Sequence, residues 1–369
     1  MISTTHLCLR SPHPYSVSLD AALRRLVLIV GIAAAIPLRA GDLDSHPFPA
    51  GGYSAALLRV ERQQAADDHI AAPGGRTRLL THGHRTARVD VLLHGFTDSP
   101  NQFATLADSL FVSGDNVYVP RLPHHAERSG DARALAGLKA VELRRTADSA
   151  TDVATALGDT VIVIGLSVGG TMAAWIGQHR REARRIVMIA PAFAAGRVPS
   201  RLERYLINLV ERLPNVTRRA APDSARPDRN PGFATHALAE VLRLGSAVED
   251  AATTAPPQAT EFVLLLNDRD RTIKSAAALA VAKDWERSGA SVSVYTLPAS
   301  LGLPHNVLDG REEATHPPFI IPALVAMAHG STPPEPLRRR ATVKREWTEG
   351  EMVIRTSSTR RPPSARLLP

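Results

Sequence analysis

The stretch from Val161 to Thr171, which reads V-I-V-I-G-L-S-V-G-G-T, constrains the fold more than any other part of the chain. Its first four residues are apolar and β-branched, which is typical of a strand that is buried on both faces. From Val168 onward the apolar residues recur at helical spacing, with Met172 and Ile176 on the same face. The chain is therefore expected to pass through one sharp turn from a buried strand into a helix.

That turn contains G-L-S-V-G, residues 165–169, which matches the pattern G-x-S-x-G. A nucleophile on so sharp a turn has strained backbone dihedrals and close neighbours on both sides. Gly165 and Gly169 remove the side chains that would clash there. Ser167 then stands above the sheet, where the N-terminal end of the following helix favours a developing negative charge. We therefore expect Ser167 to be a nucleophile.

Strands and helices alternate along the chain from Arg76, which predicts an α/β fold. The expected strands are Thr77–Thr81, Arg88–Leu93, Asn116–Val119, Thr160–Ile164, Arg185–Ile189, Glu261–Leu266 and Ser291–Leu297, and the expected helices are Phe103–Val112, Ala134–Leu157, Val168–His179, Ser275–Arg287 and His316–Ala328. Such an alternation predicts a mostly parallel central sheet with helices on both faces. The active sites of these sheets lie at the carboxyl ends of the strands.

Residues 192–258 interrupt the alternation. Leu202–Leu213 is amphipathic, residues 214–231 are rich in Pro, Arg and Asp, and Phe233–Val248 has a helical pattern again. A stretch of this length between two strands predicts an inserted helical subdomain, which in this position would cap the site. The alternative is a solvated insertion without a role.

The N-terminal part precedes the α/β domain, which we place at residues 76–329. Residues 1–40 hold a thirteen-residue apolar run, Leu26–Leu38, directly after Arg24 and Arg25. This pattern indicates a signal peptide or membrane anchor, with the catalytic domain exported from the cytoplasm and membrane association through residues 24–40. A buried helix or a mis-called start, and hence a cytoplasmic protein, is the alternative. Residues 41–75 are interpreted as a connecting segment with a helical piece around Ala55–Gln64.

The net charge of +8 belongs to the two ends of the chain. Residues 1–40 carry +3 and residues 330–369 carry +5, which leaves residues 41–329 without net charge. This distribution argues against nucleic-acid binding by the folded domain. The basic, Pro-rich segment 330–369 has no periodicity and is expected to be disordered. Cys8 is the single cysteine, so no internal disulfide can form.

Two loops supply candidates for an oxyanion hole, the group of N–H donors that stabilises a tetrahedral intermediate. The first, His94-Gly95-Phe96-Thr97, follows the strand Arg88–Leu93. A loop in this place can aim a backbone N–H at the substrate, and we assign that donor to Phe96, with the N–H of Val168 as the second. His94 itself is interpreted as a structural histidine rather than a base.

The base and the acid of a triad are expected after later strands, in the chain order Ser, Asp, His. His305 follows the strand Ser291–Leu297, whereas its competitor His316 stands before two prolines. Asp268 and Asp270 both follow Glu261–Leu266, and the local pattern does not choose between them. The paired histidines at 82 and 84 and at 124 and 125 lack matching carboxylate or cysteine spacing, so neither a metal nor another cofactor is expected.

Four blocks together resemble the α/β-hydrolase superfamily, and most closely its bacterial carboxylesterases and monoacylglycerol lipases. The blocks are H-G-F-T-D-S-P at 94–100, G-L-S-V-G-G at 165–170, N-D-R-D-R-T-I at 267–273 and H-N-V-L-D at 305–309. The resemblance covers residues 76–329. It implies that Asp270 is the acid, because Asn267, Asp270 and Ile273 occupy the family's G-x-x-D-x-x-V positions. It also implies oxyanion donors at Phe96 and Val168 and a cap after the strand that ends near Ile189.

These observations predict a serine hydrolase that cleaves carboxylic esters, either short to medium acyl esters or monoacylglycerols. Ser167 would form an acyl-enzyme, His305 would transfer the proton, and Asp270 would hold the imidazole tautomer. A thioesterase or amidase with the same triad is one alternative. A non-catalytic exported binding protein on this fold is another, and an adaptor that binds nucleic acid or membrane through its basic tail is a third. The oligomeric state is left open.

Overall fold

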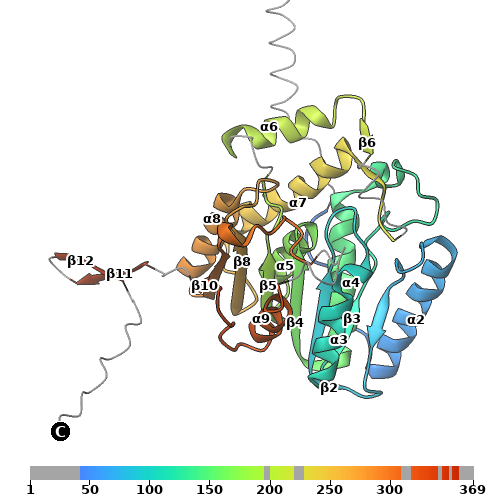
Figure 1. The fold of residues 1–369 in the computed structure, drawn as a ribbon, viewed down its shortest axis with the longest axis horizontal. Coiled ribbons are helices and arrows are strands. Elements are labelled where there is room, and N and C mark those ends of the chain that lie inside the picture. The colour runs from blue at the N-terminus through green and yellow to red at the C-terminus, as the bar shows by residue number, and fades with distance from the viewer. Residues whose placement is uncertain are drawn as a thin grey trace, which may run out of the picture.

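The computed structural model describes residues 42–194, 200–219, 228–308, 317–339, 343–348 and 351–356. An eight-stranded sheet runs through the body in the order β1-β3-β2-β4-β5-β8-β9-β10 (Figure 1). Its strands are β1 (Arg78–Leu80), β2 (Thr86–Leu93), β3 (Asn116–Val119), β4 (Gly158–Leu166), β5 (Ala183–Ile189), β8 (Glu261–Asn267), β9 (Ser291–Leu297) and β10 (Arg338–Arg339). The outer strands β1 and β10 are antiparallel to their neighbours and all the other pairs are parallel.

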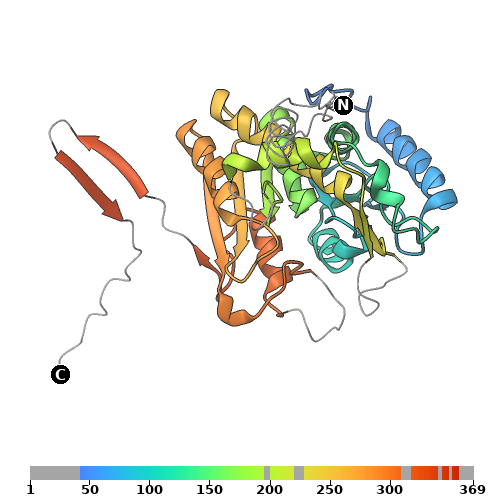
Figure 2. The same ribbon diagram turned by 90° about the horizontal axis from the view of Figure 1, so that it is seen from above.

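Helices cover both faces of this sheet (Figures 1 and 2). One face carries α2 (Tyr53–Ile70), α4 (Ala140–Leu157), α5 (Val168–His179), α7 (Thr235–Thr254) and α8 (Ser275–Arg287), and the other carries α3 (Ala104–Val112) and α9 (Ile320–Ala328). The residues of strand β4 contribute alternately to the hydrophobic cores on the two faces of the sheet. Val161 and Val163 belong to the first core, whereas Ile162 and Ile164 belong to the second, because successive side chains of a strand point to opposite faces. The predicted mostly parallel α/β fold is confirmed.

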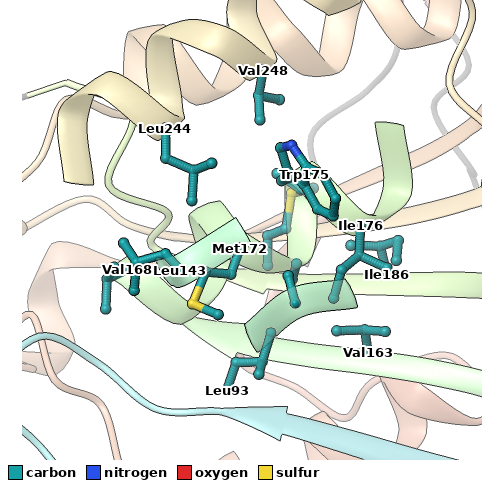
Figure 3. Packing of buried hydrophobic residues seen from close by; sticks show 14 of the residues in the cluster. Leu93, Leu143, Val163, Val168, Met172, Trp175, Ile176, Ile186, Leu244 and Val248 are labelled. Atoms are coloured by element: carbon teal, nitrogen blue, oxygen red, sulfur yellow. The ribbon is translucent and has the colours of Figure 1, made fainter. Parts of the chain in front are cut away.

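Helix α5 lies at the centre of the larger core. Figure 3 shows Met172 and Trp175 of this helix with β-strand residues on one side and Leu244 and Val248 of α7 on the other. All residues from Val168 to Gln178 are buried, as expected of a helix that is apolar on nearly every side. The helix is therefore a firm base for the turn that precedes it.

The insertion is shorter than predicted. It holds α6 (Ser200–Val210) and a small hairpin of β6 (Thr217–Arg219) and β7 (Gly232–Ala234), but α7 packs in the main core against α4, α5 and α8. The predicted boundary of 192–258 is corrected accordingly, because the helix expected at Phe233–Val248 belongs to the domain itself. Ile207 of α6 lies on Ala239 and Leu242 of α7, so the insertion rests on that helix (Figure 1).

The ends of the domain also differ from expectation. Helix α2 is longer than the predicted piece Ala55–Gln64, and its Ala56 and Val60 join the main core, so the connecting segment is part of the domain. Beyond Gly330, β10 pairs with β9, and β11 (Val343–Thr348) pairs with β12 (Glu351–Thr356) in a hairpin that stands apart from the body (Figures 1 and 2). The prediction of a disordered tail is therefore wrong for these strands, because backbone hydrogen bonds between two strands require no apolar periodicity.

Other predictions fall outside the described residues. These are the apolar run Leu26–Leu38 with the rest of residues 1–41, and His316. A signal peptide or membrane anchor therefore stays a prediction. In the part of the chain that the structure describes, no helix has both the length and the apolar character that a membrane crossing requires.

Candidate active site

Ser167 occupies the turn between β4 and α5 with a backbone φ of 56° and ψ of −113°. Residues other than glycine rarely adopt a positive φ, and strain of this kind is concentrated at functional sites. A Cβ atom at Gly165 would lie 2.0 Å from the carbonyl oxygen of Gly169, and one at Gly169 would lie 1.8 Å from that of Leu93. Because both obstacles are backbone atoms, only glycine fits at either position. The N–H of Ser167 donates to the carbonyl of Ile189 at 2.9 Å, which fixes the turn.

The structure brings Ser167, His305 and Asp270 together at the carboxyl ends of β4, β9 and β8. The Nε2 atom of His305 lies 3.0 Å from the Oγ atom of Ser167. The Nδ1 atom of the same ring lies 2.5 Å from Oδ2 of Asp270. A carboxylate at this distance accepts the Nδ1 proton, and the lone pair of Nε2 then faces the hydroxyl of Ser167. The arrangement can accept a proton from the serine.

Asp270 is built to remain ionised. Its side chain is 0% exposed, and its Oδ1 atom accepts the backbone N–H groups of Thr272 at 2.8 Å and Ile273 at 3.4 Å. Burial raises the pKa of this carboxyl group, but the hydrogen bond and charge of His305 and the two N–H donors together hold it below its ordinary value. Asp268, the other candidate, is exposed, and the bond to Nδ1 of His305 is made by Asp270.

The two expected oxyanion donors belong to the loop after β2 and to the start of α5. Val168 is the first residue of α5, so its N–H has no carbonyl partner within that helix. Phe96 lines the same cavity as Ser167, which has a volume of about 300 Å³. In the described part of the chain, the N–H groups of Phe96 and Val168 take part in no hydrogen bond. They remain available to a negatively charged oxygen next to Ser167.

His94 has a different environment. Its ring is fully buried, its Nε2 accepts the N–H of Leu122 at 3.1 Å, and its Nδ1 lies 3.1 Å from the carbonyl of Gly95. Burial, and next the neighbouring His125, lowers its pKa well below the ordinary value. Both ring nitrogens are therefore engaged in holding two loops, which leaves no lone pair for a proton from Ser167.

Two charged residues of the cavity were missed in the sequence analysis. Asp98 and Arg229 both line it and form an ion pair with an N–O distance of 2.8 Å. Asp98 follows the H-G-F-T motif directly, which was a usable signal. Arg229 lies in a polar segment more than a hundred residues later, and no local pattern connects it with the site.

One group in the described residues has the spacing of metal ligands. The donor atoms of Asp90, Asp115 and His329 lie within 4.8 Å of one another. Asp115, however, already accepts a hydrogen bond from Arg88 at 2.8 Å and contacts Nε2 of His329 at 2.6 Å. Burial, and next the charge of Asp115, raises the pKa of Asp90 well above its ordinary value, which favours the neutral carboxylic acid, a poor ligand for a cation. The paired histidines are not part of this group.

Known proteins resemble this chain in sequence and in fold. The profile described as "Alpha/beta hydrolase family" matches residues 91–328. A thermostable monoacylglycerol lipase from Bacillus sp. (strain H-257) is 31% identical over 137 residues, which are 34% of this chain and 51% of that relative. The match thus spans about half the length of the relative.

Two solved structures share the fold at low sequence identity. That of the metagenome-derived lipolytic enzymes LipS and LipT has a TM-score of 0.52 and 18% identity, covering 70% of this chain and 99% of the other. That of the Paleococcus ferrophilus monoacylglycerol lipase has a TM-score of 0.50 and 16% identity, covering 68% and 98%. At sequence identities this low, the similarity shows a shared fold.

Proposed function

This chain belongs to the alpha/beta hydrolase family, and from that premise we propose that it is a serine hydrolase of carboxylic esters. Ser167 is the nucleophile, His305 the general base and then the general acid, and Asp270 the group that orients the imidazole. All three residues lie within the matched range 91–328. The partial match to a monoacylglycerol lipase supports an ester as the bond that is cleaved.

One observation carries this proposal, the continuous hydrogen-bonded line from Ser167 Oγ through His305 to Asp270, with distances of 3.0 Å and 2.5 Å. As Oγ attacks the carbonyl carbon of the ester, its proton passes to Nε2. The alkoxide-like oxygen of the tetrahedral intermediate accepts the N–H groups of Phe96 and Val168. Loss of one such donor typically costs about 3–4 kcal/mol of transition-state stabilisation.

The second half of the reaction uses the same groups. Nε2 of His305 returns the proton to the departing alcohol, which leaves an acyl group on Ser167. Water then attacks the acyl carbon while His305 takes its proton. The second tetrahedral intermediate releases the carboxylic acid as Nε2 returns that proton to Oγ of Ser167. Asp270 keeps Nδ1 protonated throughout, so the imidazole presents the correct nitrogen in both halves. No bound cofactor takes part in these steps.

The cavity argues for a short acyl group. Its volume of about 300 Å³ is at the low end of the usual range of ligand pockets. Polar side chains supply much of its wall, including Gln102, Arg229 and Asn306. A long alkyl chain would displace water from this polar wall, so its burial there would be less favourable than in an apolar pocket. We therefore propose esters of short acids as the preferred substrates.

A panel of p-nitrophenyl esters from acetate to laurate, together with monoacylglycerols, tests the proposal. We expect the purified protein to hydrolyse the short esters fastest, and Ser167→Ala to lose this activity. Ser109→Ala, which removes a half-buried hydroxyl of α3 that donates only to the carbonyl of Thr105, is the control and should match the parent. Equal rates in Ser167→Ala and the parent would refute the proposed nucleophile, and a maximum at laurate would refute the proposed acyl preference.

A further inference from the structure

Residues 228–230 of the insertion are fastened to the loops around the cavity. The N–H of Asn230 donates to the carbonyl of Thr97 at 2.9 Å. Oδ2 of Asp228 accepts the side-chain amide of Asn101 at 3.1 Å. Between them, Arg229 forms its ion pair with Asp98. The end of the insertion is thus bound to the loop that presents the N–H of Phe96.

Asp98 is the centre of this network and is 5% exposed. The guanidinium of Arg229 binds both of its oxygens, with Nε 3.1 Å from Oδ1 and Nη2 2.8 Å from Oδ2. The side-chain amide of Gln102 donates to Oδ2 at 2.9 Å, and that of Asn306 donates to it at 3.1 Å. A two-pronged pair between guanidinium and carboxylate restricts geometry more than a single contact does.

Two of these partners lead directly to the reacting groups. Oε1 of Gln102 accepts the N–H of Gly95 at 2.7 Å, which orients the chain immediately before the N–H of Phe96. Asn306 follows His305 in the sequence, so its bond to Asp98 fixes the loop that holds the imidazole. One carboxylate therefore joins the oxyanion loop, the histidine loop and the insertion.

We propose that Asp98 is a positioning residue that holds the Phe96 N–H and the His305 ring in their reacting arrangement and links both to the insertion through Arg229. This inference rests on the proposed ester hydrolysis. Asp98 has no bond to Ser167 in the described structure, so it acts through its neighbours.

If Asp98 only stabilised the fold, an ionised carboxylate would not be needed at this buried position. Removing a carboxylate from water costs several kcal/mol, and a buried ion pair is often no more stabilising than apolar side chains of the same volume. The cost is visible at Asp98, since burial raises its pKa to about 6 despite the facing Arg229. The geometry that the carboxylate imposes on three segments accounts for its presence, because small displacements of reacting groups reduce rates strongly.

The test uses Asp98→Asn, Arg229→Gln and the double variant, with kcat, KM, the rate of labelling by a fluorophosphonate probe and the melting temperature as readouts. Asp152→Asn is the matched control. Its partner Arg180 is 2.6 Å away, the two side chains are 5% and 0% exposed, and neither lines the cavity. Control and test variants therefore each lose a buried ion pair, and only the test variants lose it next to the cavity.

We expect kcat and the labelling rate to fall on the order of tenfold to hundredfold in Asp98→Asn, with KM changed far less. Arg229→Gln should fall in the same direction, and the double variant should be no worse than the more impaired single variant, because both changes break one network. Arg229→Lys should recover part of the rate. Asp152→Asn should lower the melting temperature and leave kcat near the parent value.

Losses of rate in Asp98→Asn no larger than in Asp152→Asn would overturn the inference, and so would additive losses in the double variant. If Asp98→Asn does not fold, Arg229→Gln decides by the same criterion, since it breaks the bond from the less buried side. An active parent with unimpaired Asp98 and Arg229 variants would refute only this inference. A parent that neither hydrolyses esters nor reacts with the probe would refute the proposed function, and this inference with it.

Discussion

The Nε2 atom of His305 lies 3.0 Å from the Oγ atom of Ser167, although 138 residues separate the two in the sequence. The topology of the sheet explains the meeting. Strands β4, β5, β8 and β9 are neighbours and run parallel, so the loops that follow them emerge at one edge. The insertion lengthens the chain between β5 and β8 without separating these strands. Loop chemistry at this edge can therefore change while the scaffold stays the same.

The acid of the triad is tested by two isosteric substitutions. Asp270→Asn should lower kcat by about 10⁴, roughly 5 kcal/mol, because the amide can stabilise the wrong imidazole tautomer. KM and the fold should change little. Asp268→Asn is the neighbouring control and should stay within about tenfold of the parent, since the side chain is exposed and Nδ1 of His305 is bonded to Asp270. Steady-state kinetics of both variants decide, and the reverse ranking would move the acid to Asp268.

The turn at Ser167 should not tolerate a methyl group. In Gly169→Ala the new Cβ would lie 1.8 Å from the carbonyl oxygen of Leu93. Backbone cannot move aside cheaply, so we expect a loss of more than about 4 kcal/mol in the free energy of unfolding, or no folded protein. Gly51→Ala is the control, because a Cβ there meets nothing within 4 Å, and it should change stability by less than about 0.5 kcal/mol. The free energy of unfolding of each variant is measured by urea denaturation. A Gly169→Ala protein that is nearly as stable as the parent would contradict the described turn.

Asp98 should give the free energy of unfolding a pH dependence opposite to that of most paired carboxylates. Burial raises its pKa from 3.8 to about 6 and outweighs the attraction of Arg229. The stabilisation from this group is therefore present below pH 3.8 and is lost as the pH rises to about 6. Relative to Asp98→Asn, the parent should lose up to about 3 kcal/mol over this range. Urea denaturation of both proteins at several pH values measures the difference, and a parent that gains stability over the variant would show the opposite sign.

Local pattern was sufficient for elements that pack with a clear period. Strand β9 and helices α5 and α8 begin and end at the predicted residues, because their apolar residues recur at a single spacing between polar turns. The expectation of disorder at β10 was wrong, and the hairpin of β6 and β7 was not predicted. Strands of two or three residues are too short to show an apolar pattern. The sequence also did not predict that α7 packs in the main core. The pattern of a helix shows that it has an apolar face, but it does not show which element packs against that face.

The candidate site divides in the same way. Ser167 and His305 could be selected from the sequence because each follows a predicted strand, in the chain order of this fold. Asp270 was separated from Asp268 only through the resemblance, and the distance to His305 now provides a physical reason. The link between Asp98 and Arg229 spans 131 residues and depends on how the insertion folds back, which no local spacing expresses. Export through the N-terminal apolar run remains a prediction.

Covalent labelling of Ser167 tests the central claim most directly. The purified protein is incubated with a fluorophosphonate, the number of bound phosphonyl groups is measured by mass spectrometry, and the modified peptide is sequenced. The account predicts one phosphonyl group per chain on Ser167, complete loss of ester hydrolysis in step with labelling, and no labelling of Ser167→Ala. Ester hydrolysis that persists in the fully labelled protein, or a label carried by another residue, would contradict it.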